Sequence, residues 1–410
     1  RKLFALMPPG AYSLEGSTYN EHVATPVMLW STILYEQLTG ESIFFSGLPT
    51  GAPSPHEMLD CLYRQVGPTG FLPPWDAYGW QRLSVRLLLT YLARRTGDAD
   101  PLRVLRDTDT WHILDLVAWE CDDRAWALAW WPEGLDWENG TPRYDAWMQP
   151  LTGGALQDRK TRTRLFQYWD QTGGMPHCGR AEVNPNAITL EAFGTPLLMD
   201  GAGTISEDLT AIPTDVVCDY APDVVDGLLR GRKQSGDAAR ANAAKRAVGG
   251  FVGMSNSLHF DGEDWYCAKR RAHGKGESCY SAGPLQVITS DATEYYADRY
   301  DVTRVRRISA MLTGRWTVTM DQVMAETEHD VTWQVFAAPD VQVHDKGIRA
   351  VTPDGVGLLI ASEGGKPSVD AAPEFPKRAP YGQGGSRIRF AGKTQDGRYE
   401  RAFCLLPYEH

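Results

Sequence analysis

The sequence predicts an α+β protein of two domains, a helical domain followed by an antiparallel sheet domain. The chain has 410 residues, more than one hydrophobic core usually supports. Between residues 18 and 132 apolar residues recur every three or four positions, as in helices, and from about residue 163 they recur every second position, as in strands. We therefore place a helical domain at residues 1–150 and a sheet domain at residues 163–410, with the cleft between them as the default place for a ligand.

The helical half contains three amphipathic patterns. They run from Thr18 to Leu38, from about Tyr78 to Arg95 and from Trp111 to Trp130, and a glycine follows each of the first two. Connectors rich in Pro and Gly at residues 49–55 and 67–74 separate the patterns. We therefore expect hairpins of helices rather than one long bundle.

The second half of the chain is typical of short strands separated by turn residues. The expected strands lie at residues 163–169, 187–192, 308–311, 316–320, 332–336, 355–360, 387–390 and 399–405. The segment 237–248 differs, because it is rich in Ala and Arg and predicts a helix inserted among the strands.

Composition narrows the kinds of partner. The apolar fraction of 42% is that of a folded protein, and no run of 18 apolar residues predicts a membrane span. The net charge of −11 argues against nucleic acid. A local basic cluster can still hold an anionic ligand, and residues 269–275 and 304–307 are two candidates, although a solvated strand edge or loop explains either one more simply.

The seven cysteines contain no CxxC pair, so no zinc–thiolate site is predicted. Cys267 and Cys279 fit either a disulfide across a hairpin or two reduced thiols.

Polar groups crowd the start of the first expected helix. Thr18 and Glu21 match the S/T-x-x-E capping box, which accounts for the helix start. The capping box does not account for Tyr19 and His22, which share a helix face three residues apart, or for Glu15 in the preceding turn. These three residues are therefore candidates for a functional site.

Four segments in order resemble the heparinase II/III-like polysaccharide lyases, a family that includes alginate and heparin lyases. Residues 10–19, Gly-x-Tyr-x-x-Glu-Gly-x-x-Tyr, are similar to a motif of its toroid domain. Residues 180–201 resemble its strand pair, residues 255–262 (SNSLHFDG) its His-Asn-Thr block, and residues 300–323 its strand, turn and strand in which Asp321 recurs. The resemblance implies an N-terminal (α/α) toroid, incomplete in this chain, followed by an antiparallel β-sandwich.

The resemblance also implies that the protein cleaves a uronic-acid polysaccharide by β-elimination. A base removes the C5 proton once the neighbouring carboxylate is neutralised, and an acid protonates the departing O4. In the family, a tyrosine at the position of Tyr19 makes these transfers, and its ordinary pKa near 10 requires help from a nearby cation. Arg180, at the position of the family's first active-site histidine, and His177 in the preceding Gly- and Pro-rich turn are the candidates. We predict Tyr19, His177 and Arg180 as the catalytic residues.

We expect a sugar-binding surface around these residues and no required cofactor. The predicted binding residues are Glu15, Asn20, His22, Tyr168, Trp169, Asn184 and Trp265. Where several family members bind zinc, this chain has Glu182, Asp200 and Ser255, so two nitrogen ligands are missing and zinc is not expected. A calcium ion held by Glu182 and Asp200 stays open, with a salt bridge from either carboxylate to an arginine as the alternative.

The residue that neutralises the uronate in the family lies on a helix upstream of the tyrosine, and this chain begins only 18 residues before Tyr19. We expect that helix to belong to an additional N-terminal fragment that completes the toroid, while Arg180 and Asn20 are the alternative. The chain starts with Arg1 and no signal peptide precedes it, as in a processed product. The expected partner is an anionic polysaccharide or oligosaccharide, and the expected location is secreted or periplasmic.

Two other functions fit the same residues. A glycoside hydrolase would use two carboxylates, for which Glu15, Glu21, Glu182 and Asp200 are candidates. A non-catalytic carbohydrate-binding protein would stack sugars on Tyr168, Trp169 or Trp265.

Overall fold

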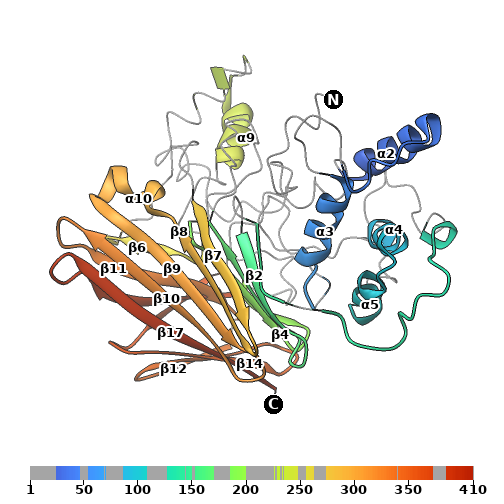
Figure 1. Ribbon diagram of the computed structural model, residues 1–410. Helices are drawn as coiled ribbons and strands as arrows, with labels where there is room; N and C mark the ends of the chain where they lie inside the picture. The colour runs from blue at the N-terminus through green and yellow to red at the C-terminus, as the bar shows by residue number, and fades with distance from the viewer. Residues whose placement is uncertain are drawn as a thin grey trace. The chain divides into compact units, whose positions relative to one another are not determined.

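The protein forms two compact units (Figure 1), one comprising residues 1–73 and 81–145 and the other residues 74–80 and 146–410. The computed structural model describes residues 25–46, 54–68, 70, 86–108, 127–143, 145–149, 153–169, 185–199, 226, 229–230, 233, 235–247, 255–262, 274–338, 340–372 and 385–409. Within these ranges the first unit is helical and the second is built mainly from sheets, as an α+β chain requires.

The helical unit contains four described helices, whose ends follow from local sequence. They are α2 (Thr25–Thr39), α3 (Pro55–Gln65), α4 (Arg86–Thr96) and α5 (Asp100–Asp107). At the start of α3, the Ser54 hydroxyl accepts from the Glu57 amide at 3.1 Å, and the Glu57 carboxylate accepts from the Ser54 amide at 2.6 Å. This reciprocal capping box satisfies two backbone donors that the helix leaves unpaired. Leucines of all four helices meet in one core, which includes Leu29, Leu62, Leu89 and Leu102.

Four helices do not establish a toroid, so that part of the predicted fold stays a prediction. The helix starts expected at Thr18 and Tyr78, and most of the helix expected at residues 111–130, lie outside the described residues.

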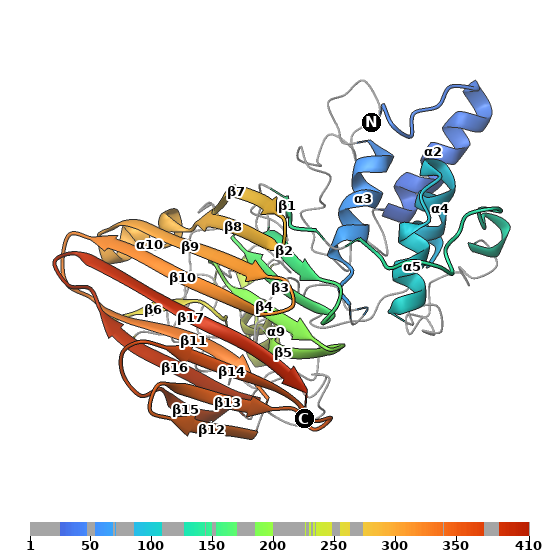
Figure 2. The ribbon, with the colours of Figure 1, turned by 60° about the horizontal axis from the view of Figure 1, so that its bottom comes forward.

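The sheet unit is a β-sandwich of two antiparallel sheets (Figure 2). The first sheet runs in the order β1 (Trp147–Gln149), β2 (Gly153–Asp158), β3 (Thr163–Tyr168), β4 (Ile188–Ala192), β5 (Thr195–Met199), β11 (Asp330–Ala337), β16 (Gly385–Lys393) and β15 (Ser368–Ala372), and β6 (Leu258–Phe260) also pairs with β11. The second runs in the order β12 (Asp340–His344), β13 (Gly347–Val351), β14 (Val356–Ser362), β17 (Arg398–Glu409), β10 (Trp316–Ala325), β9 (Val302–Leu312), β8 (Leu285–Asp291) and β7 (Lys275–Ala282). The antiparallel sandwich expected from the sequence is therefore present.

The sheet unit also starts earlier than predicted, since β1 and β2 precede residue 163. It contains α9 (Asp237–Ala247), close to the helix expected at 237–248, and α10 (Thr293–Tyr300), which the sequence analysis did not predict. Among the helices that the structure describes, none is long and apolar enough to cross a membrane.

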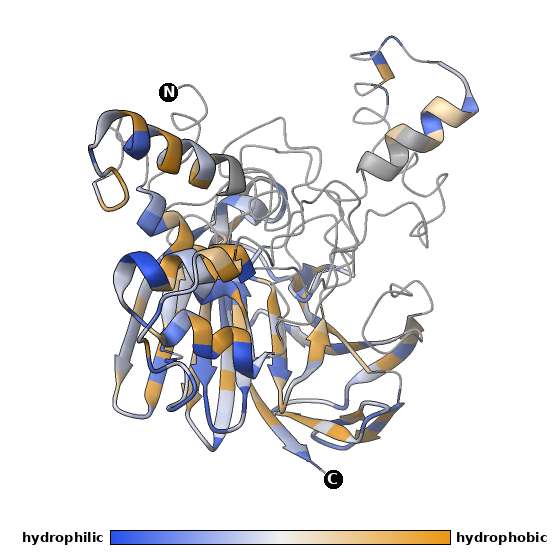
Figure 3. Ribbon diagram, turned by 90° about the vertical axis from the view of Figure 1, so that its right-hand side faces the viewer, coloured by the Kyte–Doolittle hydropathy of each residue, from blue (hydrophilic) through white to orange (hydrophobic). Residues whose placement is uncertain are grey.

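One hydrophobic core fills the space between the two sheets. Trp333 on β11 stacks on Phe403 of β17, with ring centroids 3.9 Å apart, so the two layers are in direct contact. Figure 3 shows apolar and polar residues alternating along the strands, and buried positions alternate with more exposed ones along β9. The period of two that predicted these strands thus reflects one face turned to the core and one turned away.

Candidate functional site

The structure describes strands that lie next to the predicted catalytic residues His177 and Arg180 in the sequence, but not those residues themselves. Most residues predicted for the site lie outside the described residues, namely Glu15, Tyr19, Asn20, Glu21, His22, His177, Arg180, Glu182, Asn184, Asp200 and Trp265. Strand β5 ends at Met199, directly before Asp200 in the sequence, and β6 follows the described block that starts at Ser255. These strands and the residues that join them form the framework next to the predicted site.

A buried ion pair lies at the centre of this framework. Arg307 on β9 and Asp321 on β10 are direct cross-strand partners. The Arg307 Nε and Nη2 atoms lie 2.6 and 2.7 Å from the two carboxylate oxygens of Asp321, in a bidentate arrangement. Both side chains are almost completely shielded from solvent, at 0% and 1% exposed. Burial raises the pKa of Asp321, and the adjacent guanidinium opposes that rise.

The same guanidinium also connects the two sheets. Its third nitrogen, Nη1, donates to the backbone carbonyl of Asn186 and, at 3.2 Å, to that of Asn256. Asn186 lies just before β4 and Asn256 just before β6, and both strands belong to the opposite sheet. Arg307 therefore fixes the backbone of two segments that carry the family-like motifs, at the residues next to the predicted site.

The Asn256 side chain reinforces this arrangement. Its Nδ2 donates to the carbonyls of Ile188 at 2.7 Å and Met199 at 2.9 Å, and its Oδ1 accepts from the Phe336 amide at 2.8 Å. One fully buried amide thus joins β4, β5 and β11. Asn256 is the asparagine of the SNS block, so this position of the motif has a structural role in this chain.

Hydrogen-bonded side chains extend the polar layer through the sandwich interior. The Ser290 hydroxyl on β8 donates to Asn186 Oδ1 at 2.7 Å, and Gln167 on β3 donates to Ser290 at 2.5 Å. Ser309 on β9 donates to the Gln167 carbonyl oxygen. Because each of these side chains has a hydrogen-bond partner, the layer helps to hold the two sheets in one register.

The structure does not support the stacking role predicted for Tyr168 and Trp169. Both rings are fully buried at 0% exposed, so neither offers a face to a sugar. Trp169 fits a slot made by glycines, because a Cβ at Gly154 would lie 3.0 Å from its ring and one at Gly276 would lie 2.6 Å from it. Tyr168 packs against Phe166, with ring centroids 4.8 Å apart. These two aromatics belong to the core rather than to a binding surface.

No group of three His, Cys, Asp or Glu side chains among the described residues is placed to hold a metal ion. Ser255, which stands at the position of a zinc-binding histidine in the resembling family, is fully buried, and its hydroxyl is hydrogen-bonded to that of Ser257. The other residues of that predicted cation site, Glu182 and Asp200, lie outside the described ranges. Cys279 carries a free thiol on β7, and Cys267 lies outside the described residues.

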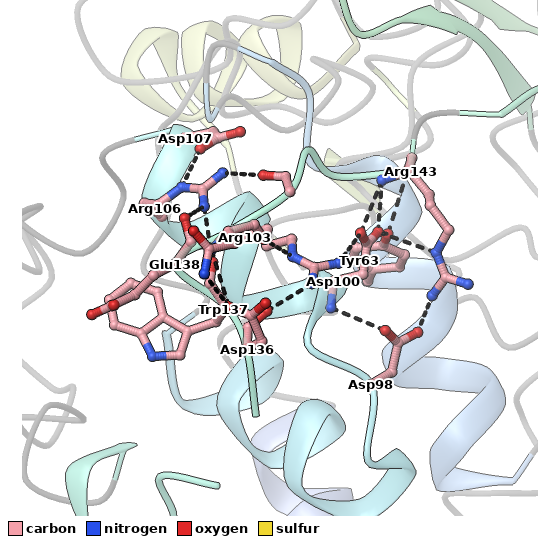
Figure 4. Close-up of polar contacts among 12 residues, drawn as sticks. Tyr63, Asp98, Asp100, Arg103, Arg106, Asp107, Asp136, Trp137, Glu138 and Arg143 are labelled. Carbon is pink, nitrogen blue, oxygen red and sulfur yellow. Dashed lines mark hydrogen bonds and ion pairs between the residues drawn. The ribbon is translucent and has the colours of Figure 1, made fainter. Parts of the chain in front are cut away.

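The helical unit has its own polar cluster, shown in Figure 4. The fully buried carboxylate of Asp100 accepts from the backbone amide of Arg143, at 2.8 Å for Oδ2 and 3.0 Å for Oδ1, and from the Tyr63 hydroxyl. Arg106 donates to the carbonyls of Trp137, Glu138 and Gly140 at 2.9, 2.6 and 3.0 Å. These contacts tie the segment 137–143 to α5, which is a structural task.

The Tyr63 phenol in this cluster is unsuited to act as a base. Burial and the negative charge of Asp100 raise its pKa well above the ordinary value of 10. Tyr296 and Tyr399 in the sheet unit are raised in the same direction, mainly by burial. A tyrosine that ionises near neutral pH needs a lowered pKa, so these three side chains are not candidates for the proton transfers predicted for Tyr19.

Comparison with solved structures identifies the architecture. A crystal structure of a mutant of heparan sulfate lyase HepC from Pedobacter heparinus superposes with a TM-score of 0.66, at 11% sequence identity, and the match covers 100% of this chain. The chain has a heparinase III-like fold. A heparinase III gene product and a further heparinase III crystal structure give TM-scores of 0.62 and 0.63 at 10% and 11% identity.

This chain spans about half the length of these heparinase III structures, since the matches cover 54–55% of them. No protein-family model matches the sequence, and no curated protein matches it. The resemblance inferred from the four motifs is therefore confirmed at the level of the fold.

The role of Arg307 differs from both interpretations of its segment. Residues 304–307 were a candidate cluster for an anionic ligand, with a solvated strand edge or loop as the simpler explanation, whereas the side chain of Arg307 is fully buried. The alternation along β9 did not reveal this burial, because the inward positions Val305, Arg307 and Ser309 include two polar residues. The opposite face carries Ile308, Ala310 and Leu312, and the partner that accounts for the burial, Asp321, lies on the neighbouring strand.

Proposed function

We propose that this protein is a polysaccharide lyase that cleaves a uronic-acid-containing polysaccharide by β-elimination. The observation that supports the proposal most strongly is the heparinase III-like fold over the whole chain, combined with four family-like motifs in the expected order. The proposed substrate is an anionic polysaccharide or oligosaccharide, and the proposed location is secreted or periplasmic.

In the proposed mechanism, Tyr19 removes the proton at C5 of the uronate and returns a proton to the departing O4. Ionising a phenol of pKa near 10 at pH 7 costs about 4 kcal/mol, and a cation beside the phenolate lowers that cost. Arg180 and His177 are proposed to supply this positive charge and to hold the uronate carboxylate. The proposed sugar-binding residues are Glu15, Asn20, His22, Asn184 and Trp265.

The described framework gives these roles a physical basis. Arg180 and Asn184 lie within six residues of Asn186 in the sequence, and the Asn186 carbonyl is held by the buried guanidinium of Arg307. This anchor fixes the chain directly after the segment that carries Arg180 and Asn184, and we propose that it helps to place that segment for proton transfer.

Incubation with uronate polymers tests the proposal. β-Elimination leaves an unsaturated uronide that absorbs in the ultraviolet, whereas a hydrolase releases only reducing ends and a binding protein releases neither. We expect the wild-type protein to produce the absorbing product from at least one polymer among heparan sulfate, alginate and hyaluronan. We expect Tyr19→Phe to abolish the product, while Tyr280→Phe, a change at an exposed position of β7, serves as the matched control. Reducing ends without the absorbing product would favour the hydrolase.

A further inference from the structure

A pocket lies at one end of the β-sandwich, where turns of the two sheets meet. It has a volume of about 180 Å³ and is lined by Asp158, Thr161, Phe193, Leu312, Arg315 and Trp316, among others. Asp158 is the last residue of β2 and Thr161 lies in the β2–β3 turn, while Phe193 lies in the β4–β5 turn. Arg315 lies in the β9–β10 turn, directly before Trp316, the first residue of β10. We refer to it as the hairpin pocket.

The walls of the hairpin pocket are held together by hydrogen bonds. The Asp158 carboxylate accepts from the Lys160 amide at 3.0 Å, from the Thr161 hydroxyl at 2.7 Å and from the Gly314 amide at 2.6 Å. The last of these bonds joins the two sheets. In addition, the Phe193 amide donates to the Thr161 carbonyl at 2.9 Å. The pocket is therefore a preformed feature of the fold.

The groups at the mouth of the pocket remain available for a ligand. Arg315 is exposed, and its guanidinium has no ion-pair partner within the described part of the chain. Trp316 is half-buried, and no stacked aromatic ring covers it among the residues described. By contrast, the Thr161 hydroxyl donates to Asp158 at 2.7 Å and lies 2.8 Å from the Thr163 hydroxyl, so it is engaged within the protein.

The charge around the pocket is locally positive, although the whole chain carries −11. The segment next to Asp158 reads Asp-Arg-Lys-Thr-Arg, so Arg159, Lys160 and Arg162 are close in sequence to the lining residues Asp158 and Thr161, and Arg315 itself lines the pocket. The one carboxylate in the lining, that of Asp158, is occupied by three donors of the turns. A local basic cluster of this kind concentrates anions independently of net charge.

From these features we infer that the hairpin pocket binds an acidic sugar unit of a polysaccharide. The Trp316 ring offers a flat apolar face for a pyranose ring. Arg315 offers a fork of donors for a carboxylate or sulfate. The polymeric nature of the ligand rests on the proposed function, whereas the anionic sugar chemistry follows from the pocket itself.

The pocket adjoins Thr163 at the start of β3, whereas His177 and Arg180 follow the other end of this strand in the sequence. Six residues of strand put the two ends of β3 about 17 Å apart. A polymer held at the pocket would therefore stay near the protein between cleavage events, which raises the effective concentration of its other sugar units.

Affinity electrophoresis tests this inference. The full chain carrying Tyr19→Phe, which limits cleavage of the polymer, is run in native gels with and without heparan sulfate. In this background we expect Arg315→Gln and Trp316→Ala each to weaken the retardation, with an apparent Kd about tenfold higher for the loss of one charged or stacking contact. Trp316→Phe keeps an aromatic ring and is expected to retain most of the binding. This result would show that the weaker binding of Trp316→Ala comes from the loss of the ring rather than from misfolding.

Arg304→Gln is the matched control, because Arg304 lies near the other end of β9, and its loss changes net charge by the same amount. Equal retardation of all variants, or an equal loss in Arg304→Gln, would overturn the inference. The lyase assay is scored separately on the wild-type chain. If retardation depends on Arg315 and Trp316 but no unsaturated product forms, the binding site is supported and the proposed function is contradicted. If the unsaturated product forms but retardation does not depend on these two residues, the proposed function is supported and the binding site is contradicted.

Discussion

The guanidinium of Arg307 and the carboxylate of Asp321 form a bidentate pair in the interior of the sandwich, with contacts of 2.6 and 2.7 Å. Because both charges are shielded from water, each depends on the other for compensation. Removing either partner alone would therefore leave an uncompensated charge in the interior and destabilise the fold. Arg307 also holds the carbonyls of Asn186 and Asn256, so the arrangement of the candidate site depends on it.

We predict that Asp321→Ala lowers the free energy of unfolding by about 3–5 kcal/mol, because it leaves an unpaired buried cation. Chemical denaturation of the sheet unit measures this loss. Asp370→Ala is the control, because it breaks the Arg389–Asp370 pair at 2.7 Å, which lies at the surface, and should cost less than about 1 kcal/mol. Similar decreases in the free energy of unfolding in both variants would contradict the assignment of Asp321 as the buried partner of Arg307.

Trp169 and Trp316 are predicted to respond in opposite ways. Trp169→Ala removes a fully buried ring from the core and should cost about 3–5 kcal/mol of stability. Trp316→Ala should change stability by no more than about 1 kcal/mol, because the ring is half-buried at the pocket mouth. Thermal unfolding of both variants measures the difference. A stable Trp169→Ala variant would reopen the sugar-stacking role for that residue.

The stability of the sheet unit is predicted to depend on the protonation of His329. Its ring nitrogens lie 2.8 Å from carboxylate oxygens of Asp261 and Asp301. Burial alone would lower the pKa of His329, but hydrogen bonds to these carboxylates outweigh burial and raise it above 6.5. The stabilisation of the folded state by protonated His329 is therefore complete below pH 6.5, and it is lost as the pH rises through the pKa of His329 in the folded state.

Denaturation of wild type and His329→Asn from pH 5 to pH 9 measures this dependence. The stability advantage of the wild type should shrink as the pH rises. The exposed His344, on β12, provides the control, since His344→Asn should leave the pH profile as it is. A constant difference between wild type and His329→Asn at all pH values would show that protonation of His329 does not contribute.

The capping box of α3 leads to a prediction for the helical unit. Ser54→Ala should destabilise this unit by about 1 kcal/mol, because the Glu57 amide loses its acceptor. Glu57→Gln should cost less, since an amide side chain still accepts from the Ser54 backbone. Thermal unfolding followed by circular dichroism at a helix-sensitive wavelength compares the two. Equal stability of wild type and Ser54→Ala would contradict a role for the cap.

Some of the architecture is predictable from sequence because local patterns coincide with tertiary burial. All eight strands expected from the period of two are present, since one face of each is in the core. Strand β7 was not predicted, because nearly all of its positions are exposed and its residues do not alternate. Helix α3 was overlooked between its Pro- and Gly-rich neighbours, although the Ser54-Pro55-His56-Glu57 run contains a complete capping signal.

The candidate site is less predictable, because its framework joins residues that are far apart in the chain. Sequence similarity to family motifs drew attention to Asp321 and to the SNS block, but nothing local indicates that Arg307 meets both Asn186 and Asn256. The hairpin pocket was overlooked for the same reason, since Asp158 and Gly314 become neighbours only when the sheets pack. Aromatic content misled the analysis at Trp169, whose burial depends on the distant Gly276.

The position of β17 has a consequence for biosynthesis. This strand, residues 398–409, lies inside its sheet between β14 and β10, both of which precede it in the chain. During translation the two halves of that sheet are made first, and each exposes an unpaired strand edge until residues 398–409 leave the ribosome. Nascent chains stalled before residue 398 should therefore be prone to aggregation and to recognition by chaperones, because the strand that closes the sheet is made after both of its neighbours.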